Sequence, residues 1–352
     1  MKLLPATSLA AAALTGLSVL AAAPATADVG PAEPLPAPTN VTAAQSGTDV
    51  VVSWEPVSGA TSYTAVADPG GSRCTSTTTS CSISGLPPKS SYTFVVTATD
   101  GTSTSPVSVA SAPLFVRARL AAPIFDTDTV QVGRSVKGRR IVAVRQGDPL
   151  SVNVLLVIGQ MHGSEEAGTS VVKRVRKAQV DPDADYQVWT IRTMNPDGLV
   201  RRNRYNAHHV DLNRNFPGTW RRQAYTGSRA ASEPETRAMM RFMKQLQPTG
   251  VLSFHQPWDT TLSVCDQRSA FWVRRTAVLI GLRSPGQPTN CGAWLPGTMN
   301  RWTARHTKAW FVTVDLAGSY RVAPQIPRAA RAVLDIADEM ATAGTSPAGD
   351  TG

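Results

Sequence analysis

Short runs of alternating apolar and polar residues occupy the first third of the chain. A period of two residues is typical of a strand with one buried face. The runs cover residues 49–54, 62–66 and 91–98, and turn-forming clusters lie around them at 56–60, 68–71 and 85–90. Regularly spaced strands without an intervening helix are typical of a β-sandwich. The pattern therefore predicts an all-β domain over residues 39–116.

Between residues 117 and 341, continuous apolar segments alternate with helix-like ones. The apolar segments cover residues 152–158, 188–191, 251–254 and 310–314, and the helix-like segments cover 167–178 and 233–246. Strands that are apolar throughout are typical of a sheet covered on both faces, and their alternation with helices is typical of an α/β fold. The chain is therefore predicted to be multidomain, with an α/β domain following the sandwich.

The composition allows two folded domains and does not indicate a nucleic-acid-binding protein. The chain has 352 residues, of which 42% are hydrophobic, and its net charge is +10. Its lysines and arginines form short scattered clusters, and no stripe of basic and aromatic residues accompanies them. We expect no nucleic-acid partner. The positive charge suits a secreted protein that faces an anionic cell surface.

Residues 1–27 have the features of a secretory signal peptide. A lysine near the start precedes a short apolar stretch, and Ala25-Thr-Ala27 is a small-x-small cleavage site. We expect cleavage near Ala27 and export of the mature protein. Residues 28–38 are predicted to be a linker and residues 342–352 a disordered tail. No later stretch is apolar and long enough to predict a membrane span after cleavage.

The four cysteines fit an oxidising compartment. Cys74 and Cys81 lie in the predicted sandwich, and Cys265 and Cys291 lie in the α/β domain. Three pairings of four cysteines exist, and the local pairs Cys74–Cys81 and Cys265–Cys291 are the simplest. Neither pair has the close spacing of a structural zinc motif. The sequence therefore favours two disulfide bonds.

Three segments of the first domain resemble a fibronectin type III module. They are Trp54-Glu-Pro-Val, Gly59-Ala-Thr-Ser-Tyr63 and Leu86-Pro-Pro-Lys-Ser-Ser-Tyr92-Thr-Phe-Val-Val. The resemblance implies that Trp54 and Tyr92 belong to the core of the sandwich. This part of the chain contains no histidine. A spacer, or a module that contacts the cell surface or a polysaccharide, is the expected role.

Two histidines and a carboxylate follow the apolar strands of the second domain. His162 and Glu165 come just after the strand at 152–158, and His255 directly follows the strand at 251–254. Open α/β sheets place their active sites at such strand ends. Two histidines and a carboxylate leave the fourth position of a zinc ion for water or substrate. Surface or supporting positions are expected for the other three histidines, His208, His209 and His306.

The residues between these positions resemble the zinc carboxypeptidase family. After His162-x-x-Glu165 come Asn195-Pro-Asp-Gly198, Arg201-Arg-Asn-Arg204 and Val210-Asp-Leu-Asn-Arg-Asn-Phe-Pro217, in the order of that family. The resemblance implies a mixed sheet flanked by helices and one zinc ion bound by His162, Glu165 and His255. It also implies that Arg214, with Asn213 beside it, grips the terminal carboxylate of a substrate. A planar guanidinium suits bidentate carboxylate binding.

Two further catalytic positions carry open alternatives. The family's oxyanion-polarising arginine falls on Arg201 as the first of its run, with Arg204 as the competitor because loop lengths do not fix the register. Asp315, in Thr313-Val-Asp315-Leu316, stands where the family has a glutamate that acts as general base. Aspartate is one methylene shorter, and base catalysis requires a reach of about 2.6–3.2 Å.

The predicted function is that of a secreted zinc metallocarboxypeptidase that hydrolyses C-terminal peptide bonds. One alternative is an amidase that acts on cell-wall stem peptides. Residues 296–302 and His255-Gln-Pro-Trp258 resemble the murein-peptide amidase branch, and the family's substrate-covering tyrosine has no clear match. A second alternative is a non-catalytic relative that binds zinc and a peptide, because Asp315 replaces the usual glutamate.

Overall fold

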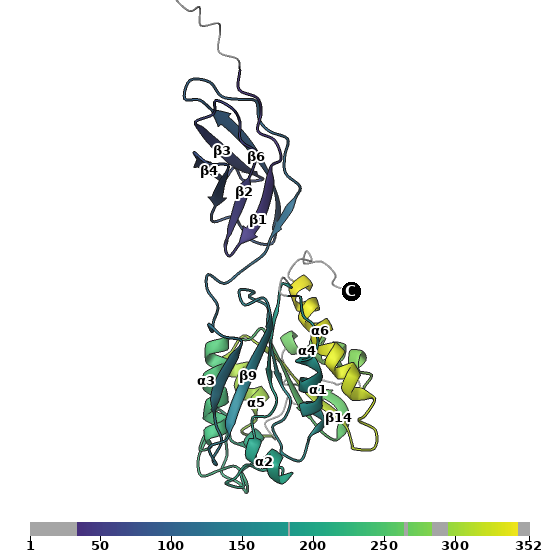
Figure 1. The fold of residues 1–352 in the computed structure, drawn as a ribbon. Helices are drawn as coiled ribbons and strands as arrows, with labels where there is room; N and C mark the ends of the chain where they lie inside the picture. Colours follow the sequence, from purple (N-terminus) through teal and green to yellow (C-terminus); the bar gives the residue numbers. More distant parts are fainter. Residues whose placement is uncertain (1–33, 182–183, 264–266, 284–294, 344–352) are drawn as a thin grey trace, which may run out of the picture.

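The computed structural model describes residues 34–181, 184–263, 267–283 and 295–343, which form two structural units (Figure 1). The N-terminal unit contains β1 (Thr42–Ser46), β2 (Asp49–Ser53), β3 (Ser62–Asp68), β4 (Arg73–Ser76), β5 (Ser80–Ile83), β6 (Ser90–Thr99) and β7 (Leu114–Val116). These strands form two sheets, with the orders β1-β2-β5 and β4-β3-β6-β7, and neighbouring strands are antiparallel. The predicted signal peptide lies outside the described residues.

The alternating pattern of the sequence becomes the core of this sandwich. Alternate residues of β3 and β6 are buried, as a strand with one covered face requires. Trp54 and Tyr92 are both buried, which confirms their predicted place in the core. Cys74 of β4 and Cys81 of β5 form a disulfide bond, as predicted. The other predicted pair, Cys265–Cys291, lies outside the described residues.

Three serines tie an irregular segment, residues 104–112, to one edge of β6. Ser105, Ser108 and Ser111 are buried, whereas the residues between them are exposed. The Oγ atom of each serine accepts a hydrogen bond from a backbone N–H of β6, at 2.9–3.1 Å. The backbone N–H of each serine donates to the carbonyl oxygen of the same β6 residue, at 2.9 Å. A repeat of three residues is that of a polyproline II helix and not of a strand.

The connection between the two units is anchored to the second unit. The guanidinium of Arg119 lies 2.7 Å from the carboxylate of Asp148, whose side chain is almost fully buried. Phe125 then packs against Trp189 and Phe242, with ring centroids 5.2 and 5.6 Å apart. The chain is therefore held by the second unit before the first strand of that unit begins.

The second unit is built on a seven-stranded mixed sheet. Its strands are β8 (Thr129–Arg134), β9 (Arg140–Gly147), β10 (Val154–Ile158), β11 (Gln187–Ile191), β12 (Gly250–His255), β13 (Trp258–Leu262) and β14 (Trp310–Ala317). The sheet order is β13-β14-β12-β10-β11-β9-β8. The four central strands are parallel, and β8, β9 and β13 add antiparallel edges. All residues of β10, β11 and β12 are buried, as expected for strands covered on both faces.

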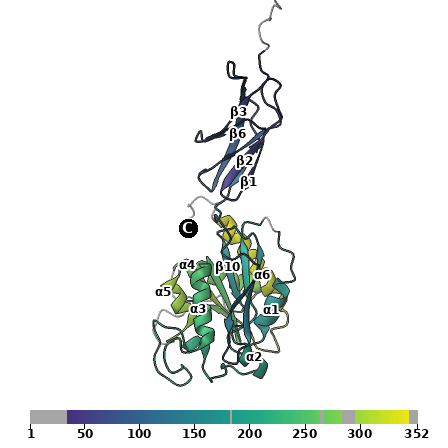
Figure 2. The same ribbon diagram turned by 60° about the vertical axis from the view of Figure 1, so that its left-hand side comes forward.

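Helices cover both faces of this sheet (Figure 2). The α-helices described in this unit are α1 (Ala167–Val175), α2 (Pro196–Arg201), α3 (Pro234–Leu246), α4 (Gln267–Ile280), α5 (Met299–His306) and α6 (Gln325–Ala343). Side chains of α1, α4 and α6 share one hydrophobic core, and those of α3 and α5 share the other. The predicted fold class is confirmed. Among the described residues, no helix combines the length and apolar character that a membrane crossing requires.

Candidate active site

Three neighbouring parallel strands deliver polar side chains to one edge of the sheet. The turn after β10 carries His162 and Glu165, and β12 ends at His255. Asp315 lies on β14, directly opposite His255 in the pairing register. Carboxyl ends of adjacent parallel strands meet at the same edge of a sheet, which is where open α/β folds bind ligands.

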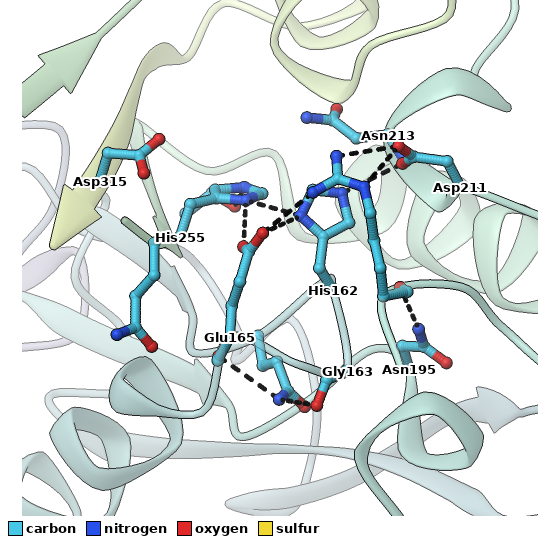
Figure 3. Close-up of polar contacts among 12 residues, drawn as sticks. His162, Gly163, Glu165, Asn195, Asp211, Asn213, His255 and Asp315 are labelled. Carbon is cyan, nitrogen blue, oxygen red and sulfur yellow. Dashed lines mark hydrogen bonds and ion pairs between the residues drawn. The ribbon is translucent and has the colours of Figure 1, made fainter. Parts of the chain in front are cut away.

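His162, Glu165 and His255 converge on one point. One ligand atom from each residue lies within 4.8 Å of the other two, and all three residues are buried. The Nδ1 atom of His162 lies 2.8 Å from Glu165 Oε1, and His255 Nδ1 lies 3.0 Å from Glu165 Oε2 (Figure 3). Two imidazole nitrogens and a carboxylate are the donor set of a three-ligand zinc site with one open position. The predicted ligand residues are therefore brought together.

The outward-facing nitrogen of each histidine is also hydrogen-bonded. His162 Nε2 lies 3.0 Å from Asp211 Oδ1, and His255 Nε2 lies 3.2 Å from Ser253 Oγ. Such partners fix the tautomer and the ring orientation of metal-binding histidines. Neither Asp211 nor Ser253 was predicted. Asp211 stands inside the Val210–Pro217 motif, but no spacing rule connects it to a histidine 49 residues earlier.

Burial and hydrogen bonding act in opposite directions on this cluster. Burial alone would lower the pKa of His162, but hydrogen bonds with Asp211 and Glu165 raise it above the ordinary value. Burial alone would raise the pKa of Glu165, but hydrogen bonds with His162 and His255 hold it well below its usual range. Glu165 therefore remains ionised, as a metal ligand must be.

Asp315 shares the cavity but has a different environment. Its Oδ1 accepts a hydrogen bond of 3.2 Å from the backbone N–H of Trp258. Burial raises the pKa of the Asp315 carboxyl, and the nearby His255 opposes this effect only in part. A carboxylate with a raised pKa is a stronger base than an exposed one. Figure 3 shows Asp315 across an open space from Asn213.

Of the two candidate arginines, Arg204 lies at the cluster and Arg201 does not. Arg204 donates from Nη1 to Glu165 Oε1 at 3.1 Å and from Nη2 to Asp211 Oδ2 at 2.9 Å. Its guanidinium lines the cavity that contains the ligands. Arg201 instead donates to the carbonyl oxygen of Asn206 at 2.8 Å. Of the two alternatives that the sequence left open, the structure therefore places Arg204, and not Arg201, beside the ligand cluster.

A chain reversal after α2 explains this difference. Arg201 ends the helix, and Arg202 adopts a left-handed conformation with φ of 48°. The chain then returns past Gly163, whose N–H donates to the carbonyl oxygen of Arg204 at 3.3 Å. A Cβ atom on Gly163 would lie 2.1 Å from the carbonyl carbon of Gly198, so no larger residue fits there. This close approach sets Arg204 beside Glu165.

Asn213 and Arg214 lie on the far wall of the same cavity, which has a volume of about 160 Å³. They belong to a single 3₁₀ turn, Leu212–Arg214, in which the Asn213 N–H donates to the Asp211 side chain. Asn213 Oδ1 accepts a hydrogen bond of 3.0 Å from Met299 N–H, and the amide nitrogen has no partner among the described residues. Arg214 uses Nη1 to donate to the carbonyl oxygen of Asn213. No other hydrogen bond of this guanidinium is found within the described part of the chain, so its remaining N–H groups can bind an anion.

Residues 126–325 match the sequence profile of the family described as zinc carboxypeptidase. The match covers more than half of the chain. The chain belongs to the zinc carboxypeptidase family. Residues 36–112 match the fibronectin type III domain. Both resemblances predicted from sequence motifs are confirmed, and the family is zinc-dependent, in agreement with the donor set of His162, Glu165 and His255.

Proteins similar to parts of this chain include an amidase, a carboxypeptidase chain and a protein of known structure. Murein peptide amidase A of Escherichia coli strain K12 is 27% identical over 205 residues, which cover 53% of this chain and 81% of that protein. The human carboxypeptidase N catalytic chain is 30% identical over 162 residues, which cover 33% of this chain and 35% of that protein. Bovine thrombin-activatable fibrinolysis inhibitor shares the fold, with a TM-score of 0.51 at 16% identity over 61% of this chain and 90% of that one.

Proposed function

We propose that this protein is a zinc-dependent metallocarboxypeptidase that hydrolyses the C-terminal peptide bond of its substrates. Membership of the zinc carboxypeptidase family supports peptide hydrolysis in general. The observation that carries the finer proposal is the shared cavity, in which the ligand cluster faces a guanidinium and an amide. A substrate held there by its terminal carboxylate has its last peptide bond next to the metal ligands.

His162, Glu165 and His255 would bind one zinc ion per chain. When bound, such an ion acidifies a water molecule and polarises a carbonyl group. Asp211 and Ser253 hold the two imidazoles so that both Nδ1 atoms point at the same position.

Asp315 accepts the proton of the attacking water and later returns it to the leaving amine. Its raised pKa favours proton acceptance, and its hydrogen bond from Trp258 keeps the carboxylate directed into the cavity. Arg204 donates to the carbonyl oxygen as negative charge develops on it. Asn213 and Arg214 bind the terminal carboxylate, which restricts the reaction to chain ends.

The test is a combined metal and product analysis of the purified protein. We expect about one zinc per chain and stepwise release of C-terminal residues from a peptide library. Asp315→Asn should keep the zinc and lose the release, because the amide cannot accept the proton. Full activity of this variant would exclude Asp315 as the base.

A second candidate function is amidase activity on cell-wall stem peptides. It is supported by the similarity to murein peptide amidase A, which extends over 81% of that protein, compared with 35% of the carboxypeptidase N chain. A side-by-side assay on muropeptides and linear peptides separates the two functions. Hydrolysis confined to muropeptides would replace the carboxypeptidase proposal.

The non-catalytic alternative is tested at the same residue. A protein that has lost turnover would bind zinc and peptide but release no product, and Asp315→Glu would restore release by supplying the missing methylene. We further propose that the signal sequence directs the protein out of the cell, where the sandwich acts as a spacer or contacts the cell surface. A fusion of residues 1–27 to a reporter checks export.

A further inference from the structure

In the described residues, the side-chain amide of Asn300 is hydrogen-bonded through its oxygen and not through its nitrogen. Asn300 lies in the first turn of α5, is 8% exposed, and lines the cavity of the ligand cluster. Its Oδ1 accepts hydrogen bonds from Thr298 Oγ1 at 2.6 Å and from Arg301 N–H at 2.7 Å. Because a backbone N–H can only donate, the amide atom that faces Arg301 must be the oxygen. The orientation of the amide is therefore fixed.

The amide nitrogen of Asn300 has no hydrogen-bond partner among the described residues. Asn300 lines the cavity, so this amide nitrogen is a donor that an occupant of the cavity can use. Thr313 lies two residues before Asp315 on β14 and therefore on the same face of the strand. Its hydroxyl lines the cavity and has no partner among the described residues either. The two groups offer hydrogen bonds to whatever occupies this space.

Aliphatic side chains frame these polar groups. Leu262 of β13 and Leu295 line the same cavity. An extended aliphatic stem with a polar end fits such a lining, because the stem contacts the leucines and the end meets the Asn300 amide. The donor set of Asn300 has the chemistry of a group that recognises an oxygen acceptor.

The segment that carries Asn300 is fastened to the proposed carboxylate site. Phe216 N–H donates to the Gly297 carbonyl oxygen at 2.9 Å, and Met299 N–H donates to Asn213 Oδ1 at 3.0 Å. Gly297 has φ of 68°, and a Cβ atom there would lie 2.2 Å from the carbonyl oxygen of Arg214. Arg214 and Asn300 therefore line adjoining parts of one cavity, within reach of the carboxylate and the side chain of a single terminal residue.

We propose that the cavity selects a terminal residue whose side chain ends in a carboxylate or carboxamide oxygen, and that Asn300 determines this preference. The proposal rests on the carboxypeptidase function proposed above and specifies its substrate class. A terminal residue without an acceptor leaves the Asn300 donors desolvated and unpaired, which is the arrangement that gives strong discrimination. Glutamine and methionine have similar lengths and differ in this respect.

The experiment uses four peptides that differ only in a terminal glutamine, glutamate, methionine or lysine. We expect kcat/KM for glutamine to exceed that for methionine by about 10- to 100-fold. Asn300→Asp keeps an oxygen for Thr298 and Arg301 but replaces the donor with an acceptor. It should reverse the preference from glutamine towards lysine, which a folding defect cannot produce. Asn40→Asp, the same change in the sandwich, is the matched control and should leave the preference unaltered.

Calorimetric binding of the same peptides to the zinc-loaded full chain separates the two proposals. Tighter binding of the glutamine peptide without release of any terminal residue overturns the carboxypeptidase function and supports the selection by Asn300. Equal kcat/KM and equal binding for glutamine and methionine overturn the selection. An unchanged glutamine preference in Asn300→Asp also overturns it, because the determinant then lies elsewhere.

Discussion

In the sandwich, every second residue of β3 and β6 is buried, whereas all residues of β10 and β12 are buried in the second unit. Neighbouring strands of the sandwich are antiparallel, so their carboxyl ends are divided between its two ends. The parallel strands β10, β12 and β14 end at one edge, where they gather two histidines and two carboxylates. The common direction of these strands therefore explains how residues far apart in sequence meet at one edge of the second unit.

Loss of one proposed zinc ligand should produce the largest difference between the two units in stability and activity. His255→Ala removes a ligand and leaves the buried Glu165 without one of its partners, so we expect no zinc and no hydrolysis. Calorimetry should show a lower transition temperature for the second unit and an unchanged one for the sandwich. A chelator should act likewise on the native protein, since zinc at 100 times its Kd contributes about 2.7 kcal/mol to stability. A downward shift of both transition temperatures would contradict the prediction that the metal stabilises the second unit alone.

Asp315→Asn should reduce turnover while leaving both units folded. General base catalysis contributes about 10²- to 10⁴-fold, so kcat should fall within this range. Zinc content and both thermal transitions should stay unchanged, because no hydrogen bond within the described residues joins Asp315 to the proposed zinc ligands. Measured kcat within twofold of the native value would show that another group accepts the proton.

Asp211→Asn should weaken zinc binding without abolishing it. The variant keeps the shape of the side chain but loses the charge that holds His162 and Arg204. Loss of such an outer partner lowers metal affinity or activity by about 10- to 100-fold. Competition with a fluorescent zinc chelator measures this change, and Asp128→Asn is the control, since Asp128 contacts Arg145 outside the cavity.

The acid side of the pH–activity profile should follow the titration of Asp315 and not that of Glu165, because their pKa values are shifted in opposite directions. Asp315 must be ionised to accept a proton, and burial raises its pKa above 3.8. Activity is therefore fully present above this raised pKa and is lost as the pH falls through it. Glu165, with its lowered pKa, stays ionised over that window. A kcat without any acid limb over the pH range in which the zinc content stays constant would contradict the assignment.

The smallest effect is expected in the sandwich. Ser108→Ala leaves the N–H of Val96 without its Oγ partner, which should lower the stability of the sandwich by about 1–3 kcal/mol. Hydrolysis and the transition of the second unit should not change. Val109→Ala, in the same segment but 88% exposed, is the control and should have an effect below about 0.5 kcal/mol.

The sequence allowed prediction of features that depend on local pattern. Apolar runs located β10, β12 and β14, and the residues that follow or end these runs are the ligand cluster and Asp315. Features that depend on a chain reversal were not predictable. Loop lengths did not fix the register between Arg201, the preferred candidate, and Arg204, and only the left-handed turn at Arg202 separates their positions. The helices α4, α5 and α6 were also not predicted.

The hydrogen bonds of Asp211 also could not be predicted from local sequence pattern. Asp211 contacts a histidine 49 residues earlier and an arginine seven residues earlier. No periodicity of a helix or a strand relates these positions, so their proximity appears only when the fold is complete. The Asn300 amide is similar, because its free side is defined by two hydrogen bonds that depend on the start of α5.

The serine-spaced segment of the sandwich has a consequence for how the protein behaves at high concentration. A strand edge with regularly spaced free N–H and C=O groups can pair with the edge of another molecule. Along this edge of β6, the N–H and C=O groups are already hydrogen-bonded to residues 104–112. Because that segment has a three-residue repeat, its other backbone N–H and C=O groups point in successive directions. No continuous ladder is presented there, so a second copy of the sandwich has no template at this edge for polymerisation by strand addition.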